Sequence, residues 1–142
     1  MTDSAGLIKL LEGGLSPRYR IERELGRGGM ATVFLARDTV HGRLVAIKVL
    51  HQEIAAGVST ERFLREIRLL AALQHPHILP LYDSGAVNDI PYYVMPFVAG
   101  ESLRDRLTRD GRIPVPLALR MTSEAAAALD YANRQGIVHR DR

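Results

Sequence analysis

Residues 26–31, with the sequence GRGGMA, place three glycines in four positions between two segments that both have strand-like patterns. Gly26, Gly28 and Ala31 follow a G-x-G-x-x-[GA] spacing, which lets a backbone approach a phosphate group closely. The same spacing is also typical of an ordinary glycine-rich hairpin turn. The flanking segments must therefore decide between a phosphate loop and a plain turn.

The flanking segments alternate apolar and polar side chains. YRIEREL at 19–25 precedes the glycines, ATVFLARD at 31–38 follows them, and RLVAIKVL at 43–50 repeats the pattern. This alternation predicts three antiparallel strands joined by short turns. A Rossmann loop needs a helix after the glycines, and a P-loop needs Gly-Lys followed by Ser or Thr. Neither fits, because the segment after the glycines is strand-like and the two lysines, Lys9 and Lys48, precede Leu and Val.

The middle of the chain changes from a strand period to a helical one. STERFLREIRLLAALQ at 59–74 has apolar side chains at helical spacing, with Ser59 or Thr60 as the expected N-cap. The segments 75–85 and 90–100 then predict two further strands with an Asn-Asp turn between them. We therefore expect a five-stranded antiparallel sheet with the 59–74 helix packed against it.

Two more helices are expected after the sheet. Ser102 and Asp105 have the spacing of a capping box, and Gly111 ends the short helix that they begin. A longer helix is predicted from near Pro116 to Gly136.

Composition limits the class of protein. With 46% apolar and 25% charged residues, the 142-residue chain is typical of a soluble globular protein. No apolar run is long enough for a membrane helix, and the N-terminus lacks the basic start of a signal peptide. Cysteine is absent, which excludes disulfides and thiolate metal sites. We expect a cytoplasmic protein with no membrane segment in this chain.

The net charge of +3 raises the question of nucleic-acid binding. The arginines are spread along the chain among 16 acidic residues, without a dense basic block, so a solvated surface is favoured over a nucleic-acid interface. Only two of the 19 basic residues are lysines. Lysine at position 48 therefore stands out in a chain that otherwise uses arginine.

Three motifs together resemble the protein kinases. GRGGMATV at 26–33 resembles the kinase glycine-rich loop, VAIK at 45–48 the third-strand motif, and HRD at 139–141 the start of the catalytic loop. Order and spacing agree over 18–141, and the segments between the motifs are similar to the bacterial, eukaryotic-like serine/threonine protein kinases. The resemblance implies an α+β fold, with a kinase N-lobe of five antiparallel strands and one long helix before the first helices of a helical C-lobe.

This resemblance divides the chain into three expected parts. Residues 1–17 are a leader segment outside the core, with a short helix over 4–12 that a glycine pair ends; 18–98 are the N-lobe and hinge; 99–142 begin the C-lobe. The family continues with a metal-binding Asn, an Asp-Phe-Gly motif and an activation segment, none of which follows here. We expect a truncated kinase, cut off within the catalytic loop and inactive by itself.

The resemblance assigns three catalytic positions. Lys48 would hold the α- and β-phosphates of ATP, and Asp141 would be the base that accepts the substrate hydroxyl proton. Glu66 is nominated independently by its position in the apolar stripe of the 59–74 helix, where a carboxylate is costly without a partner. We expect it to pair with Lys48; the alternative is an exposed ion pair with Arg62 four residues earlier.

The remaining ATP-binding positions follow from the resemblance. Backbone amides of Gly28 and Gly29 would face the phosphates, and Ala31 is tolerable in place of the third glycine if its φ is negative. Val33 and Ala46 would sandwich the adenine, or simply serve as core residues. The expected ATP contacts are Leu25, Gly26, Arg27, Gly28, Gly29, Met30, Ala31, Thr32, Val33, Ala46, Lys48, Met95, Pro96 and Val98.

The hinge and the metal requirement complete the expectations. Met95 falls at the family's gatekeeper position, Pro96 replaces a common acidic residue but keeps its carbonyl, and Val98 would donate an N–H to adenine. Mg²⁺ is expected for the complete domain, although its ligands are absent from this chain. The His75-Pro-His77 sequence favours a turn over a metal site, and no metal ligand is expected in the chain.

Two functions remain open at this point. The first is a serine/threonine kinase that transfers the γ-phosphate of ATP to a protein hydroxyl, so that its partners are ATP and a protein substrate with Ser or Thr. The second is a non-catalytic nucleotide-binding or scaffold module. Self-association through the exposed C-lobe helix is also expected, because the helices on which it would pack are missing.

Overall fold

The computed structural model describes residues 4–51 and 58–136 of the chain. It separates into two compact units. The first contains the described residues up to Ala72 together with Pro80–Phe97, and the second contains Leu73–Leu79 together with the described residues from Val98 onward. The sheet and the first two helices form the first unit.

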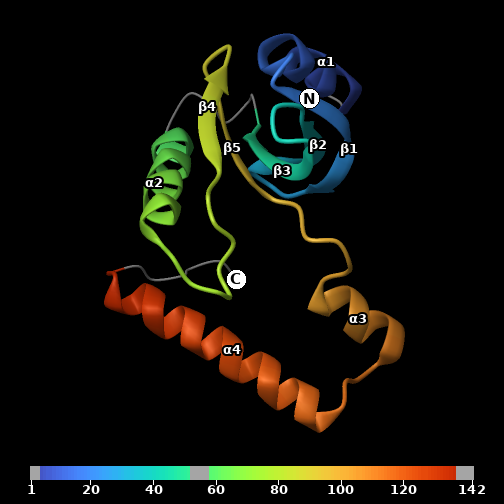
Figure 1. The fold of residues 1–142 in the computed structure, drawn as a ribbon, viewed down its shortest axis with the longest axis vertical. Helices are drawn as coiled ribbons and strands as arrows, with labels where there is room; N and C mark the ends of the chain where they lie inside the picture. The colour runs from blue at the N-terminus through green and yellow to red at the C-terminus, as the bar shows by residue number, and fades with distance from the viewer. Residues whose placement is uncertain (1–3, 52–57, 137–142) are drawn as a thin grey trace. The chain divides into compact units, whose positions relative to one another are not determined.

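The first unit is built on one antiparallel sheet of five strands in the order β1-β2-β3-β5-β4 (Figure 1). The predicted five-stranded antiparallel sheet is therefore confirmed. The glycine-rich segment is followed by a strand and not by a helix, as expected. The strands are β1 Tyr19–Arg27, β2 Ala31–Asp38, β3 Arg43–Leu50, β4 Asp83–Val87 and β5 Ile90–Pro96.

Strand alternation gives the sheet two different buried faces. Val45, Ile47 and Val49 of β3 point to one face and join the larger apolar cluster. Leu50 of the same strand points to the other face and joins a second, smaller cluster with residues of α2 (Val58–Ala72). The sheet is therefore covered on both faces.

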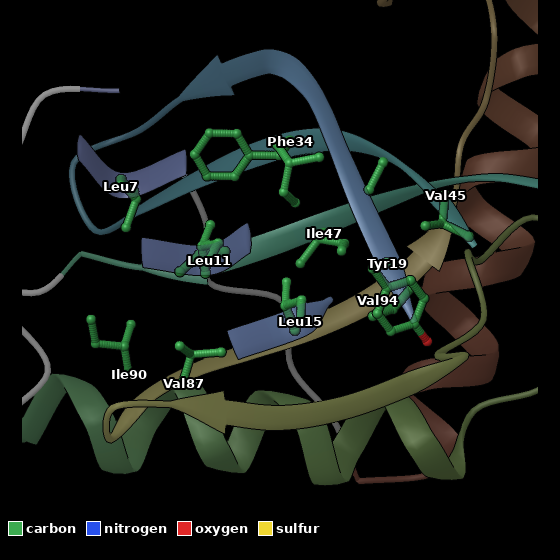
Figure 2. Close-up of a cluster of buried hydrophobic side chains, with 13 residues drawn as sticks. Leu7, Leu11, Leu15, Tyr19, Phe34, Val45, Ile47, Val87, Ile90 and Val94 are labelled. Carbon is green, nitrogen blue, oxygen red and sulfur yellow. The ribbon is translucent and has the colours of Figure 1, made fainter. Parts of the chain in front are cut away.

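Helix α1 (Ser4–Leu15) covers the face of the larger cluster. Leu7, Leu11 and Leu15, spaced by four residues, are almost fully buried against the strands (Figure 2). The expectation of a leader outside the core is therefore wrong. The helix also continues through both glycines, because Gly14 lies where its backbone meets Val87 and a β-carbon there would overlap that side chain.

Helix α2 lies on the opposite face, and the predicted packing of the 59–74 helix against the sheet is confirmed. Phe63 and Ile67 are buried with Tyr93 of β5 and with Leu50 of β3. The predicted N-cap is wrong, because Val58 is already helical and Ser59 and Thr60 therefore lie inside the first turn. Residues 52–57, which precede the helix, are outside the described residues.

The strands β4 and β5 are shorter than predicted. Residues 75–82 are not in a strand, and β4 begins only at Asp83. Pro76 and Pro80 explain the difference, because proline has no N–H for a strand ladder. The turn is as predicted: Asn88 and Asp89 have φ angles of 49° and 66°, the left-handed geometry of a two-residue hairpin.

The second unit contains α3 (Leu103–Asp110) and α4 (Val115–Arg134). The predicted capping box is present, with Ser102 and Asp105 exchanging hydrogen bonds, and Gly111 at φ 77° ends α3. The hydroxyl oxygen of Tyr131 accepts a hydrogen bond of 2.9 Å from the Gln74 N–H, which ties Leu73–Leu79 to α4. Across the described part of the chain, the helices are too short or too polar to cross a bilayer.

Candidate nucleotide-binding site

The glycine-rich loop connects β1 and β2 at the end of a hairpin. The Gly28 N–H donates to the Ala31 carbonyl at 2.8 Å, and the His51 N–H donates to the Met30 carbonyl at 2.8 Å. These two bonds fix the base of the loop to β2 and to the end of β3. They also correct one expectation: the Gly28 amide is engaged inside the turn and does not point outward toward a phosphate.

The fold itself does not require glycine in this loop. None of Gly26, Gly28 and Gly29 has a positive φ. A β-carbon at Gly26 or Gly29 would have no atom within 4 Å, and at Gly28 it would meet only the Ala31 carbonyl oxygen at 3.7 Å. Ala31 likewise has no positive φ, as its side chain demands. The open space above the loop is the geometry that a closely approaching ligand needs.

Lys48 lies in the middle of the sheet, in a row of three cross-strand neighbours. The register pairs Lys48 with Val33 of β2 on one side and with Tyr93 of β5 on the other. Cross-strand partners have side chains on the same face, so Lys48 faces the α2 side together with Tyr93. Ala46 lies two residues away on the same face, opposite Met95.

Glu66 extends from α2 toward this row. Its Oε1 atom accepts from the Lys48 ammonium at 3.4 Å and from the Tyr93 hydroxyl at 2.9 Å. The predicted Lys48–Glu66 contact is therefore present, and the structure favours it over the alternative pair with Arg62. The stripe position of Glu66 is explained by these two partners, because they satisfy a carboxylate at the edge of an apolar interface.

The ion pair between Lys48 and Glu66 contributes little to the stability of the fold. The side chains of Lys48 and Glu66 are 31% and 43% exposed, and 3.4 Å is long for a charged hydrogen bond. Pairs of this kind contribute roughly 0–1 kcal/mol to folding, since water already screens both charges. The arrangement instead leaves ammonium N–H groups available to a further acceptor above the sheet.

Tyr93 was missed at the sequence level. Burial first, then the charge of Glu66 and the hydrogen bond to it, raise the pKa of Tyr93, so the hydroxyl stays protonated and acts as a donor. Its ring also lies 5.7 Å from the Lys48 ammonium and 5.4 Å from the Phe63 ring. Alternation of side chains along the predicted strand would place Tyr93 on the same face of the sheet as Lys48, so the sequence pattern could have identified Tyr93 as a site residue.

The other expected ATP contacts occupy several environments. Leu25 is the unpaired extra residue of an irregularity in β1, and Arg27 pairs with Glu24 at 3.0 Å. Thr32 is fully buried and its hydroxyl lies 2.8 Å from His51 Nε2. Met95 packs at the edge of the α2 cluster.

Of the three remaining expected site residues, the structure describes two. Pro96 ends β5 opposite Val45. Val98 belongs to the second unit and is 65% exposed. Asp141, and with it the HRD sequence at 139–141, lies outside the described residues.

The histidine pair lies in the second unit. His77 Nδ1 lies 3.5 Å from Glu124 Oε2, and the His75 ring contacts Tyr131. Within 4–51 and 58–136, no three metal-ligating side chains come together.

Comparison with known proteins assigns the chain to a family. The family model described as the protein kinase domain matches residues 19–141, most of the chain. This chain belongs to the protein kinase family. The kinase relatives include "Probable serine/threonine-protein kinase pknA2" from Bifidobacterium longum, 43% identical over 128 residues, and serine/threonine-protein kinase PknB from Mycobacterium leprae, 42% identical over 132.

The match covers part of each relative. The match to the Bifidobacterium longum kinase covers 87% of this chain and 17% of that relative. The match to the Mycobacterium leprae kinase covers 89% of this chain and 21% of that relative. The crystal structure of the Mycobacterium tuberculosis PknI kinase domain aligns with a TM-score of 0.74 at 33% identity, over 89% of this chain and 52% of that one. The chain therefore spans about a fifth of the curated relatives and half of a solved kinase domain.

Proposed function

We propose that this chain is the ATP-binding part of a serine/threonine protein kinase that transfers the γ-phosphate of ATP to a protein hydroxyl. The observation that carries the proposal is the open glycine-rich loop of a kinase-family chain beside the Lys48–Glu66 pair. The loop offers backbone that a phosphate can approach, and Lys48 supplies a positive charge on the same sheet. Phosphoryl transfer depends on this kind of positioning and charge neutralisation.

ATP fits the residues that the first unit brings together. The loop glycines leave space where side chains would block phosphates, and the Gly29 and Met30 amides replace Gly28 as the proposed phosphate donors. Lys48 would contact phosphate oxygens, and Val33 and Ala46 are proposed to flank the adenine. The hinge contacts of Met95, Pro96 and Val98 and the base role of Asp141 stay predictions.

Mg²⁺, which the family uses with ATP, would neutralise charge that develops on the phosphates during transfer. The family supplies its ligands from an Asn in the catalytic loop and from the Asp-Phe-Gly motif, and neither occurs in these 142 residues after Asp141. The residues present therefore fit the nucleotide but not its metal. We propose that a polypeptide of these residues alone binds nucleotide weakly and transfers no phosphate.

A non-catalytic nucleotide-binding or scaffold module is the second candidate. It shares the glycine-rich loop and Lys48 with the first candidate, and differs in the absence of a protein substrate. Joining these residues to the part of a kinase relative's C-lobe that follows its HRD motif separates the two functions, because Asp141 then remains the base of the fusion. Phosphorylation of a Ser/Thr protein that requires Asp141 supports the kinase, and binding without transfer supports the module.

The nucleotide site is tested by titrating the chain with a fluorescent ATP analogue. The chain has only two lysines, so Lys48→Met has a matched control in Lys9→Met, whose side chain is exposed on α1. We expect Lys48→Met to weaken binding roughly tenfold, the effect of one lost charged contact, and Lys9→Met to leave it unchanged. Equal affinity of the two variants would contradict the proposed site.

A further inference from the structure

Tyr93 contacts both the Lys48–Glu66 ion pair and helix α2, so its role goes beyond that of a neighbour of the ion pair. Its hydroxyl donates to Glu66 Oε1 at 2.9 Å, a shorter contact than the 3.4 Å from Lys48 to the same oxygen. Its ring lies against Phe63, which is one helical turn before Glu66 on α2. One side chain of β5 thus holds two positions of α2.

We propose that Tyr93 is a positioning residue that keeps Glu66, and with it α2, against the sheet, so that Lys48 can engage a phosphate without releasing the helix. The inference rests on the proposed nucleotide site. On this proposal, Tyr93 and the Lys48–Glu66 ion pair together hold α2 against the sheet.

The physical reason lies in how the two donors share one oxygen. A carboxylate oxygen has two lone pairs, so Glu66 Oε1 accommodates both the Tyr93 hydroxyl and the Lys48 ammonium. The ammonium is on a flexible stem and is partly exposed, so a phosphate can attract it away from Glu66. The Tyr93 ring is buried and only 4% exposed, so its hydroxyl stays in place when Lys48 moves.

Without Tyr93, Lys48 would have two incompatible tasks. Each step that brings the ammonium closer to a phosphate would weaken the polar link that remains between Glu66 and the sheet within the described residues. With Tyr93, the link persists through a neutral hydroxyl that is buried and bonded to Glu66. The helix position and the phosphate contact then become independent of each other.

The position of α2 can be measured directly because the chain has no cysteine of its own. Spin labels on Arg65→Cys of α2 and Arg20→Cys of β1, both exposed positions in the first unit, report the distance between helix and sheet. Tyr93→Phe removes only the hydroxyl and keeps the ring contact with Phe63. Tyr92→Phe is the matched control, since its ring points to the α1 face and packs on the other cluster.

We expect Tyr93→Phe to broaden or shift the measured distance distribution, while Tyr92→Phe leaves it unchanged. Lys48→Met provides an independent test that does not depend on how well Tyr93→Phe folds. It should leave the distribution as in the parent chain, because Tyr93 still holds Glu66. A distribution unchanged in Tyr93→Phe, or one that Lys48→Met shifts as far as Glu66→Ala does, would overturn the inference.

Nucleotide affinity separates this inference from the proposed function. If the parent chain binds ADP, Tyr93→Phe should weaken binding roughly three- to tenfold and Tyr92→Phe should not. Equal ADP affinity of both variants and the parent overturns the positioning role while the nucleotide site stands. If the parent chain binds no ADP, the nucleotide site fails, and the distance measurements still decide whether Tyr93 positions Glu66.

Discussion

Asp38 is the most completely buried carboxylate among the described residues, at 1% exposure, and it ends β2. Its oxygens lie 3.4 Å from Arg18, 2.9 Å from His41 and 3.5 Å from Arg43, and they accept the backbone N–H groups of Val40 and His41. The sequence gives no warning of this cluster, because Arg18 is remote in the chain and strand pairing alone brings it near.

Burial would raise the pKa of Asp38, but the hydrogen bonds from the His41 side chain and from the His41 and Val40 backbone outweigh it, so the pKa is about 2. In the unfolded chain an aspartate titrates near pH 3.9. The ionised form therefore stabilises the fold, fully above about pH 5, and this contribution is lost as the pH falls through 4 toward 2.

We expect Asp38→Asn to lower the urea midpoint at pH 7, because asparagine keeps an acceptor for the backbone but loses the charge. The difference from the parent chain should shrink as the pH falls from 5 to 2.5. Asp89→Asn is the control, since Asp89 is exposed in a turn whose positive φ asparagine tolerates equally well. A difference that stays constant with pH would contradict the role given to the Asp38 charge.

For Gly28, we predict a substitution that changes nucleotide binding but hardly changes the stability of the fold. An added β-carbon meets only the Ala31 carbonyl oxygen at an ordinary 3.7 Å, so Gly28→Ala should change the free energy of unfolding by less than about 0.5 kcal/mol. If ATP phosphates lie over the loop, the same methyl group should weaken binding of the fluorescent ATP analogue severalfold. A large loss of stability with unchanged affinity would show that this glycine serves the fold instead.

At the scale of elements, regular patterns were predictable and exceptions were not. The strand periods of β1, β2 and β3 and the helical period of α2 follow from alternation that tertiary packing reinforces. The end of α1 was misplaced because a glycine pair usually stops a helix. Here Gly14 is inside the helix for a reason visible only in three dimensions, the close approach of β4.

The two glycines of α1 form a matched pair for measurement. Gly13 has no atom within 4 Å of an added β-carbon, so Gly13→Ala should stabilise the chain by about 0.5–1 kcal/mol through helix propensity. At Gly14 the added carbon would collide with Val87, so Gly14→Ala should destabilise it by roughly 1–3 kcal/mol. Urea denaturation of both variants checks the pair, and equal shifts would refute the packing of α1 against β4.

Residues of the candidate site could be predicted when the pattern of a single helix or strand, or the composition, pointed to them. Lys48 stood out by composition, and Glu66 by its place in the apolar stripe. Tyr93 was missed because its role depends on three elements, β3, β5 and α2, meeting at one oxygen atom. The engaged Gly28 amide was missed because a motif fixes residue types without fixing the hydrogen bonds inside a turn.

At the scale of the whole molecule, α4 has a mostly solvent-exposed surface that includes several apolar side chains. Val115, Leu119 and Leu129 are 69%, 67% and 49% exposed. We expect the 142-residue polypeptide to self-associate through this helix, with sedimentation showing a mass that rises with concentration. The double variant Leu119→Gln and Leu129→Gln should reduce that association. A monomer at every concentration in the parent chain would contradict the expectation.

The final prediction concerns catalysis by these 142 residues alone. Lys48 and the glycine-rich loop are proposed to hold phosphates, yet the family's metal-binding Asn and Asp-Phe-Gly positions do not occur among these 142 residues. A catalytic base such as the proposed Asp141 contributes only roughly 10²–10⁴-fold, and only when the reacting groups are aligned.

We therefore expect labelled ATP and a generic Ser/Thr protein substrate to give no phosphate transfer above the level of Lys48→Met. Appending only the part of a kinase C-lobe that follows the HRD sequence should restore transfer, and Asp141→Asn in that fusion should abolish it again, because Asp141 is then the one catalytic base present. Transfer by the 142-residue polypeptide that disappears in Lys48→Met would mean that its own residues supply the metal ligands. Those ligands would then have to come from residues other than the family's Asn and Asp-Phe-Gly positions.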